Sequence, residues 1–122
     1  MTLPPIAKEQ IIMNIAAITA VKQTLEGMKE SNQFMDLPVA WSNSFCTVRE
    51  LVGEALVSER ECPAYTLIDL QQAVDALESF KKDLPKTKNV APFKVELVKA
   101  QINAAITLIK ATITNVTNSR KQ

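Results

Sequence analysis

Apolar residues recur about every three and a half positions in four separate segments of this 122-residue chain. In the first segment, Ile11, Ile18 and Leu25 are spaced seven residues apart. This spacing places side chains on one face of an α-helix, whereas a half-buried strand alternates apolar and polar residues. The chain is therefore predicted to form helices, each with an apolar face that must be buried.

Prolines and polar segments predict where these helices begin and end. Pro38 and Pro92 suit the first turn of a helix, where a missing N–H costs nothing, while Pro63 and Pro85 end the helices before them. The predicted helices are 5–30, 38–61, 67–83 and 92–118.

Two finer expectations concern helix ends. Thr66 and Asp69 have the spacing of a capping box, in which each would bond the backbone at the start of the third helix. Residues 31–36 are expected to be a polar connection, and residues 119–122 are expected to fray.

Four amphipathic helices joined by short connections are typical of an antiparallel up-down-up-down bundle. We therefore predict an all-α, four-helix bundle that occupies residues 1–122 as one domain. A chain of this length buries about two-thirds of its unfolded surface, which is enough for one core. The chain has only two glycines, whereas the many tight turns of an all-β fold need residues that tolerate positive φ.

The composition excludes several kinds of chemistry. Without histidine there is no Ser-His or Cys-His nucleophile pair and no histidine-ligated zinc. Glycine-rich phosphate-binding motifs are also absent from the sequence. The carboxylate pairs Glu50/Glu54 and Asp75/Glu78 lie off the apolar stripes, which favours solvated surface charges. We expect no enzymatic activity, no metal and no cofactor.

The two cysteines indicate a compartment. Cys46 and Cys62 fall within one predicted helix, about 24 Å apart at 1.5 Å per residue, whereas a disulfide needs Cα atoms within about 7 Å. Both are expected to be small buried residues in a reducing environment. No run approaches the about 20 apolar residues of a membrane span, so we predict a cytoplasmic protein without such a span.

The last predicted helix has an unusual surface. From Ala100 to Ser119 its only charge is Lys110, although exposed helix faces normally carry Lys and Glu and interface centres lack them. The first helix has a broad apolar arc that implies a second neighbour. We predict a non-catalytic interaction module, such as an adaptor, regulator or chaperone, in which the first and last helices bind a protein partner or a second copy. The expected homo-oligomer is a dimer, and a packed monomer remains the alternative. The candidate partner-binding residues are Ile12, Met13, Asn103, Thr107 and Thr114.

Two other functions remain open. Five lysines within fourteen residues would suit anion binding or association with nucleic acid: Lys81, Lys82, Lys86, Lys88 and Lys94. This cluster has no arginine and only Phe93 as an aromatic neighbour, which disfavours base-specific recognition. The bundle core is also a candidate carrier of a small apolar ligand, with Met13, Met28 and Met35 as adaptable lining residues.

Overall fold

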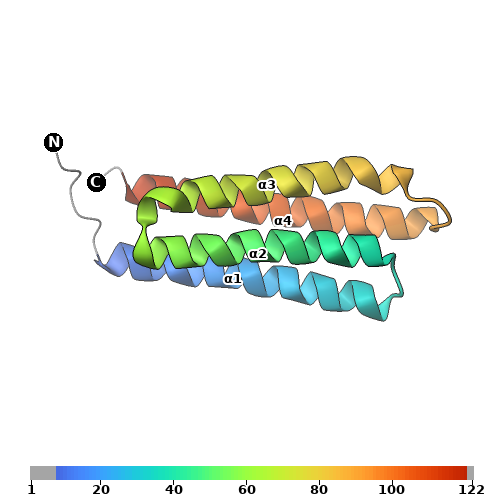
Figure 1. Cartoon of the computed structure of the whole chain (residues 1–122), viewed down its shortest axis with the longest axis horizontal. Coiled ribbons are helices and arrows are strands. Elements are labelled where there is room, and N and C mark those ends of the chain that lie inside the picture. Colours follow the sequence, from blue (N-terminus) through green and yellow to red (C-terminus); the bar gives the residue numbers. More distant parts are fainter. Residues whose placement is uncertain (1–7, 121–122) are drawn as a thin grey trace.

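The four apolar stripes form four long helices that pack side by side as an up-down bundle (Figure 1). A computed structural model describes residues 8–120. The elements are α1 (Lys8–Phe34), α2 (Val39–Glu61), the short 3-10 helix η1 (Pro63–Tyr65), α3 (Thr66–Asp83), the 3-10 helix η2 (Leu84–Lys86) and α4 (Pro92–Ser119). Each helix packs against the next, and α1 packs against α4. The predicted all-α four-helix bundle is confirmed.

Predicted and observed helix bounds differ most at the end of α1. The predicted start at residue 5 lies outside the described residues, and the helix continues to Phe34 rather than ending at residue 30. The prediction of a polar connection is therefore wrong over residues 31–34. Asn32 explains the extension, because it lies seven residues after Leu25 and is likewise buried. The chain turns at Asp36, whose φ of 56° lies in the left-handed region that Asp and Asn tolerate.

The predicted capping box at the start of α3 is wrong. The N-cap position is Tyr65, and no side chain caps the helix there. The Thr66 hydroxyl instead donates to Oε1 of Glu59 at 2.8 Å, and the Asp69 carboxylate accepts a hydrogen bond from Ser58 at 2.6 Å. Contacts with α2 thus replace local capping bonds.

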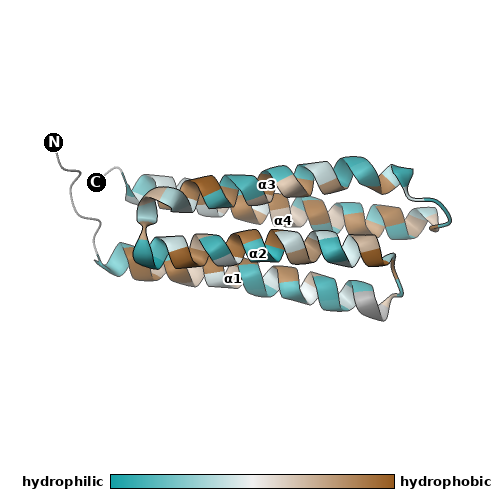
Figure 2. Ribbon diagram, in the orientation of Figure 1, coloured by the Kyte–Doolittle hydropathy of each residue, from teal (hydrophilic) through white to brown (hydrophobic). Residues whose placement is uncertain are grey.

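The core runs along the bundle axis, where apolar residues of all four helices meet. Figure 2 shows hydrophobic and hydrophilic residues on different sides of each helix. The rings of Phe45 and Phe80 pack edge to face, with centroids 5.1 Å apart and an interplanar angle of 87°. Trp41 is buried and donates its Nε1–H to the Thr87 hydroxyl at 3.1 Å, which ties α2 to the connection after α3. The largest fully buried apolar side chains include Ile18, Leu25, Phe45, Leu70, Leu77, Leu84, Ile102, Ile109, Val21, Val48 and Val52.

The cysteines only partly match the expectation. Both are free thiols, but Cys46 is half-buried and Cys62 is exposed, so the prediction that both are buried is wrong. Cys62 lies outside the core because it follows the last residue of α2, where the backbone leaves the helix with φ −149°.

Asn32 is an exception inside this core. Its side chain is fully buried, and among the described side chains neither its amide nitrogen nor its amide oxygen has a hydrogen-bond partner. On α4, Oε1 of Gln101 is also buried without a partner in the described part of the chain. A buried polar group without a partner costs about 1–3 kcal/mol.

Replacing Asn32 by leucine is therefore expected to raise the free energy of unfolding by about 1–2 kcal/mol, because an apolar side chain of similar size removes the unpaired amide. Equilibrium unfolding in urea, followed by circular dichroism, measures the change. Gln72→Leu is the matched control, since Gln72 is exposed on α3 and its replacement should leave stability nearly unchanged. A loss of stability in Asn32→Leu would contradict the expectation.

Candidate interaction face

Two hollows lie between α1 and α4 on one side of the bundle. They have volumes of about 450 Å³ and about 580 Å³. The first is lined by Gln10, Met13, Asn14, Ala17, Asn115, Asn118 and Ser119. The second is lined by Thr24, Met28, Asn103, Ala104, Thr107, Leu108 and Ala111. We call these fourteen residues the α1/α4 face. None of them carries a charge.

Other hollows of the described surface are charged. The hollow over α2 and α3 includes the carboxylates of Glu50, Glu54 and Asp69. The hollow between α3 and α4 is lined in part by Glu78, Lys81, Lys82, Glu96 and Lys99. The lack of charge is therefore a property of the α1/α4 face and not of the whole surface.

Small side chains explain why hollows form on this face. Ala17 of α1 and Ala104 and Ala111 of α4 end at Cβ, so they do not fill the space between the two helices. Of the neighbouring helix pairs, α1 and α4 also pack least closely. The result is a shallow surface that another helix can approach closely.

The polar side chains of the second hollow are partly satisfied within their own helices. The Thr24 hydroxyl donates to the Ala20 carbonyl at 2.9 Å, and the Thr107 hydroxyl donates to the Asn103 carbonyl at 2.9 Å. Covering such a hydroxyl leaves no donor without a partner, so the desolvation cost is low. Both threonines can thus contribute their methyl groups to a contact.

The structure brings three of the five predicted partner-binding residues to this face. Met13, Asn103 and Thr107 line the hollows, and Met13 is 69% exposed. Ile12 is 58% exposed and Thr114 is also exposed, but neither lines a hollow on this face. Helical rotation accounts for the difference, because Ile12 is about 100° from Met13 around α1.

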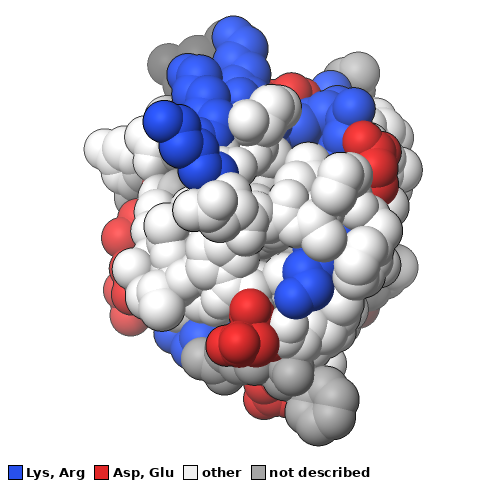
Figure 3. All heavy atoms as spheres, turned by 90° about the vertical axis from the view of Figure 1, so that its right-hand side faces the viewer, with Lys and Arg blue, Asp and Glu red and all other residues white. Residues whose placement is uncertain are grey.

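The predicted anion-binding lysines lie at the end of the bundle that carries the α1–α2 and α3–α4 connections, which we call the loop end. Figure 3 views the molecule from this end and shows basic residues gathered toward one side. Lys82, Lys86 and Lys88 are exposed, while Lys81 and Lys94 are half-buried. This cluster is separate from the α1/α4 face, since none of the five lysines lines either hollow.

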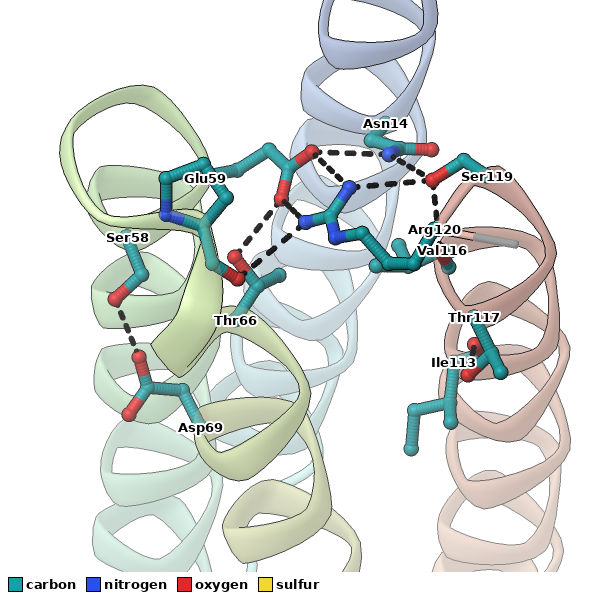
Figure 4. A network of polar contacts seen from close by, with 11 residues as sticks. Asn14, Ser58, Glu59, Thr66, Asp69, Ile113, Val116, Thr117, Ser119 and Arg120 are labelled. Carbon is teal, nitrogen blue, oxygen red and sulfur yellow. Dashed lines mark hydrogen bonds and ion pairs between the residues drawn. The ribbon is translucent and has the colours of Figure 1, made fainter. Parts of the chain in front are cut away.

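At the opposite end of the bundle, a buried polar network surrounds Glu59 (Figure 4). The Glu59 side chain is fully buried and forms an ion pair with Arg120 at the end of α4. Nη1 of Arg120 donates to Oε2 of Glu59 at 3.2 Å, and Nδ2 of Asn14 donates to the same oxygen at 2.9 Å. Thr66 supplies the bond to Oε1 described above. Glu59 therefore joins α1, α3 and α4 to the end of α2.

This network was not predicted from the sequence. Residues 119–122 were expected to fray, whereas Ser119 is helical and Arg120 is held by Glu59, so that expectation is wrong for these two residues. Residues 121–122 lie outside the described part. One signal was present, because Glu59 continues the spacing of Val52 and Ala55 and falls on the buried stripe of α2. A charge at such a position needs a buried partner, because an unpaired charge in the interior is strongly destabilising.

The described residues contain no group of three or more His, Cys, Asp or Glu side chains that could hold a metal ion. Within the same part of the chain, no helix has the length and hydropathy needed to cross a bilayer. Comparison with known proteins found no matching family model, curated protein or solved structure.

Proposed function

We propose that this chain is a non-catalytic protein–protein interaction module that binds through its α1/α4 face. It would act as an adaptor, regulator or chaperone that engages a second copy of itself or a partner protein. The observation that carries this proposal is the contrast between the uncharged α1/α4 face and the charged hollows over α2, α3 and the other side of α4. Interface centres are depleted of charged residues in the same way.

The size of the face is near the lower limit for a specific contact. At 1.5 Å per residue, the face runs about 24 Å along α4 from Asn103 to Ser119, and two adjacent helices are about 20 Å wide, so a contact would bury about 1,000 Å² in total. Specific interfaces start near this area. An uncharged surface is also complementary to itself, which favours a homodimer among the possible complexes.

The free cysteines support a location in the cytoplasm. Cys62 is exposed and has no disulfide partner among the described residues, which suits a compartment that keeps thiols reduced. We therefore propose that the interaction takes place in the cytoplasm.

Adding a charge to the centre of the α1/α4 face tests the proposal. Thr107→Glu and Ala111→Glu are each expected to raise the dimer dissociation constant at least tenfold, because a dimer would bury the new carboxylate twice without a cation. Sedimentation equilibrium across the micromolar range measures this constant. Thr114→Glu, outside the hollows, should have a smaller effect.

The control is Gln72→Glu, which adds the same charge to an exposed position of α3 and should leave association unchanged. A wild-type protein that is monomeric at all concentrations removes the homodimer from the proposal. In that case a photoreactive cross-linker at Thr107 tests the face for a partner. The proposed function is overturned if the probe at Thr107 labels no protein and a probe at Gln72 gives the same result.

A further inference from the structure

The loop end carries both lysines and exposed large apolar side chains. Its lysines lie beside large apolar side chains that point into solvent: Val39 is 74% exposed and Phe93 is 66% exposed. Both residues belong to first turns, Val39 of α2 and Phe93 of α4. Val39 shares a hollow with Lys88 and Lys94. Figure 3 shows an uncharged centre on this end, with basic residues gathered toward one side.

The positive charge at this end is only partly neutralised. Lys86 forms an exposed ion pair with Asp83 at 3.3 Å, and Nζ of Lys94 donates to the Met35 carbonyl at 3.5 Å. No ion pair involves Lys81, Lys82 or Lys88 within residues 8–120. Asp36 is the carboxylate of the neighbouring α1–α2 connection. Lys81, Lys82 and Lys99 share a hollow with Glu78 and Glu96, so the lysines outnumber the nearby carboxylates by a small margin.

Backbone dipoles add no net charge to this end. The helices α2 and α4 begin at the loop end, but α1 and α3 end there, so two partial positive helix ends are offset by two partial negative ones. Attraction to an anionic partner therefore depends on the lysines, and apolar contact depends on the exposed side chains of Val39 and Phe93.

This combination selects one kind of partner. Protein interface centres are depleted of lysine, which disfavours a protein at this end. Nucleic-acid surfaces rely on arginine and on several stacking aromatic rings, whereas the described part of the loop end offers Phe93 as its only exposed ring and has no arginine. An anionic bilayer surface attracts lysines through its phosphate groups and accepts apolar side chains at the headgroup level.

We propose that the loop end docks reversibly on the surface of an anionic lipid bilayer, with the lysines against lipid phosphates and with Val39 and Phe93 at the interfacial level. The site is distinct from the α1/α4 face, so a docked bundle keeps that face free. The protein then brings its partner to a membrane surface without crossing the bilayer.

Vesicle cosedimentation tests this proposal with the full chain. We expect binding to vesicles of phosphatidylcholine with about one-third phosphatidylserine at about 50 mM salt, and loss of binding at about 500 mM salt, where charges are screened within about 4 Å. Binding to pure phosphatidylcholine should be much weaker. Equal binding to both kinds of vesicle, or no binding to either, overturns the proposal.

Substitutions separate the electrostatic contribution of the lysines from the apolar contribution of Phe93 to vesicle binding. Lys82→Gln with Lys88→Gln is expected to lower the partition coefficient about 25-fold, since each lysine near an anionic surface contributes about fivefold. Phe93→Ser should lower the partition coefficient while leaving its salt dependence unchanged. Lys110→Gln is the control, because Lys110 is an exposed lysine of α4 about 27 Å from the start of that helix.

If Lys110→Gln lowers the partition coefficient as much as the loss of one loop-end lysine does, a positive charge anywhere on the surface is sufficient for vesicle binding. That result would overturn the proposal. Tighter binding to a short DNA duplex than to the vesicles, unaffected by Phe93→Ser, would assign the lysines to nucleic acid instead. Every substituted side chain is exposed, so circular dichroism should show an unchanged helical fold for each variant.

Discussion

Arg120→Met is expected to lower the free energy of unfolding by about 3–5 kcal/mol, because it leaves the charge of Glu59 buried without its cation. Glu59 would keep the hydrogen bonds from Asn14 and Thr66, but these neutral donors do not compensate a full charge in the interior. Urea unfolding at constant pH, followed by circular dichroism, gives the difference in stability.

Arg49→Met is the matched control for this prediction. Arg49 pairs with Glu26 at 3.9 Å, but both side chains are partly exposed, so the loss should be below about 1 kcal/mol. Equal losses for the two variants would show that the Glu59–Arg120 pair contributes no more than a surface pair. Combining Arg120→Met with Glu59→Gln should recover part of the stability, because the neutral amide leaves no buried charge.

Phe45→Ala is expected to lower the free energy of unfolding by about 3–5 kcal/mol. Phe45 is fully buried, and its ring packs against Phe80 between α2 and α3. The truncation removes apolar contact area and leaves a cavity that close-packed neighbours fill only in part. The same unfolding assay measures the loss, and Phe45→Leu should cost less because it retains most of the volume.

Phe93→Ala is the control for Phe45→Ala, because it removes an aromatic ring that is not packed in the core. Phe93 is exposed, so its truncation should change stability by no more than about 0.5 kcal/mol. If Phe45→Ala costs no more than Phe93→Ala, the Phe45 ring does not hold α2 and α3 together and the described core is wrong at that point.

Sequence periodicity was sufficient to predict the helices and most of the core. Ile18 and Leu25 were expected on one face of the first helix because burial follows the helical repeat, and both are buried. Periodicity reports which face is buried but not what lies across from it. The partner of Glu59 is Arg120, which is 61 residues away in the chain, so the pair becomes visible only in the packed bundle, where α2 and α4 lie across the core from each other.

Local rules failed where tertiary contacts offered a better partner. Thr66 can cap its own helix or bond a neighbouring one, and the buried carboxylate of Glu59 determines the outcome. The candidate site shows the same limit. The absence of charge on α4 was visible in the sequence, but the side chains of α1 that lie opposite determine that Thr107 lines a hollow and Thr114 does not.

The first turn of α1 and the last turn of α4 lie at the same end of the bundle (Figure 1). A pulling force applied to these two turns would act across the helices rather than along them, and would peel α1 from α4 one turn at a time. The ion pair between Glu59 and Arg120 at that end would be the first contact to be stretched. The bundle is therefore poorly suited to carry tension between these two turns.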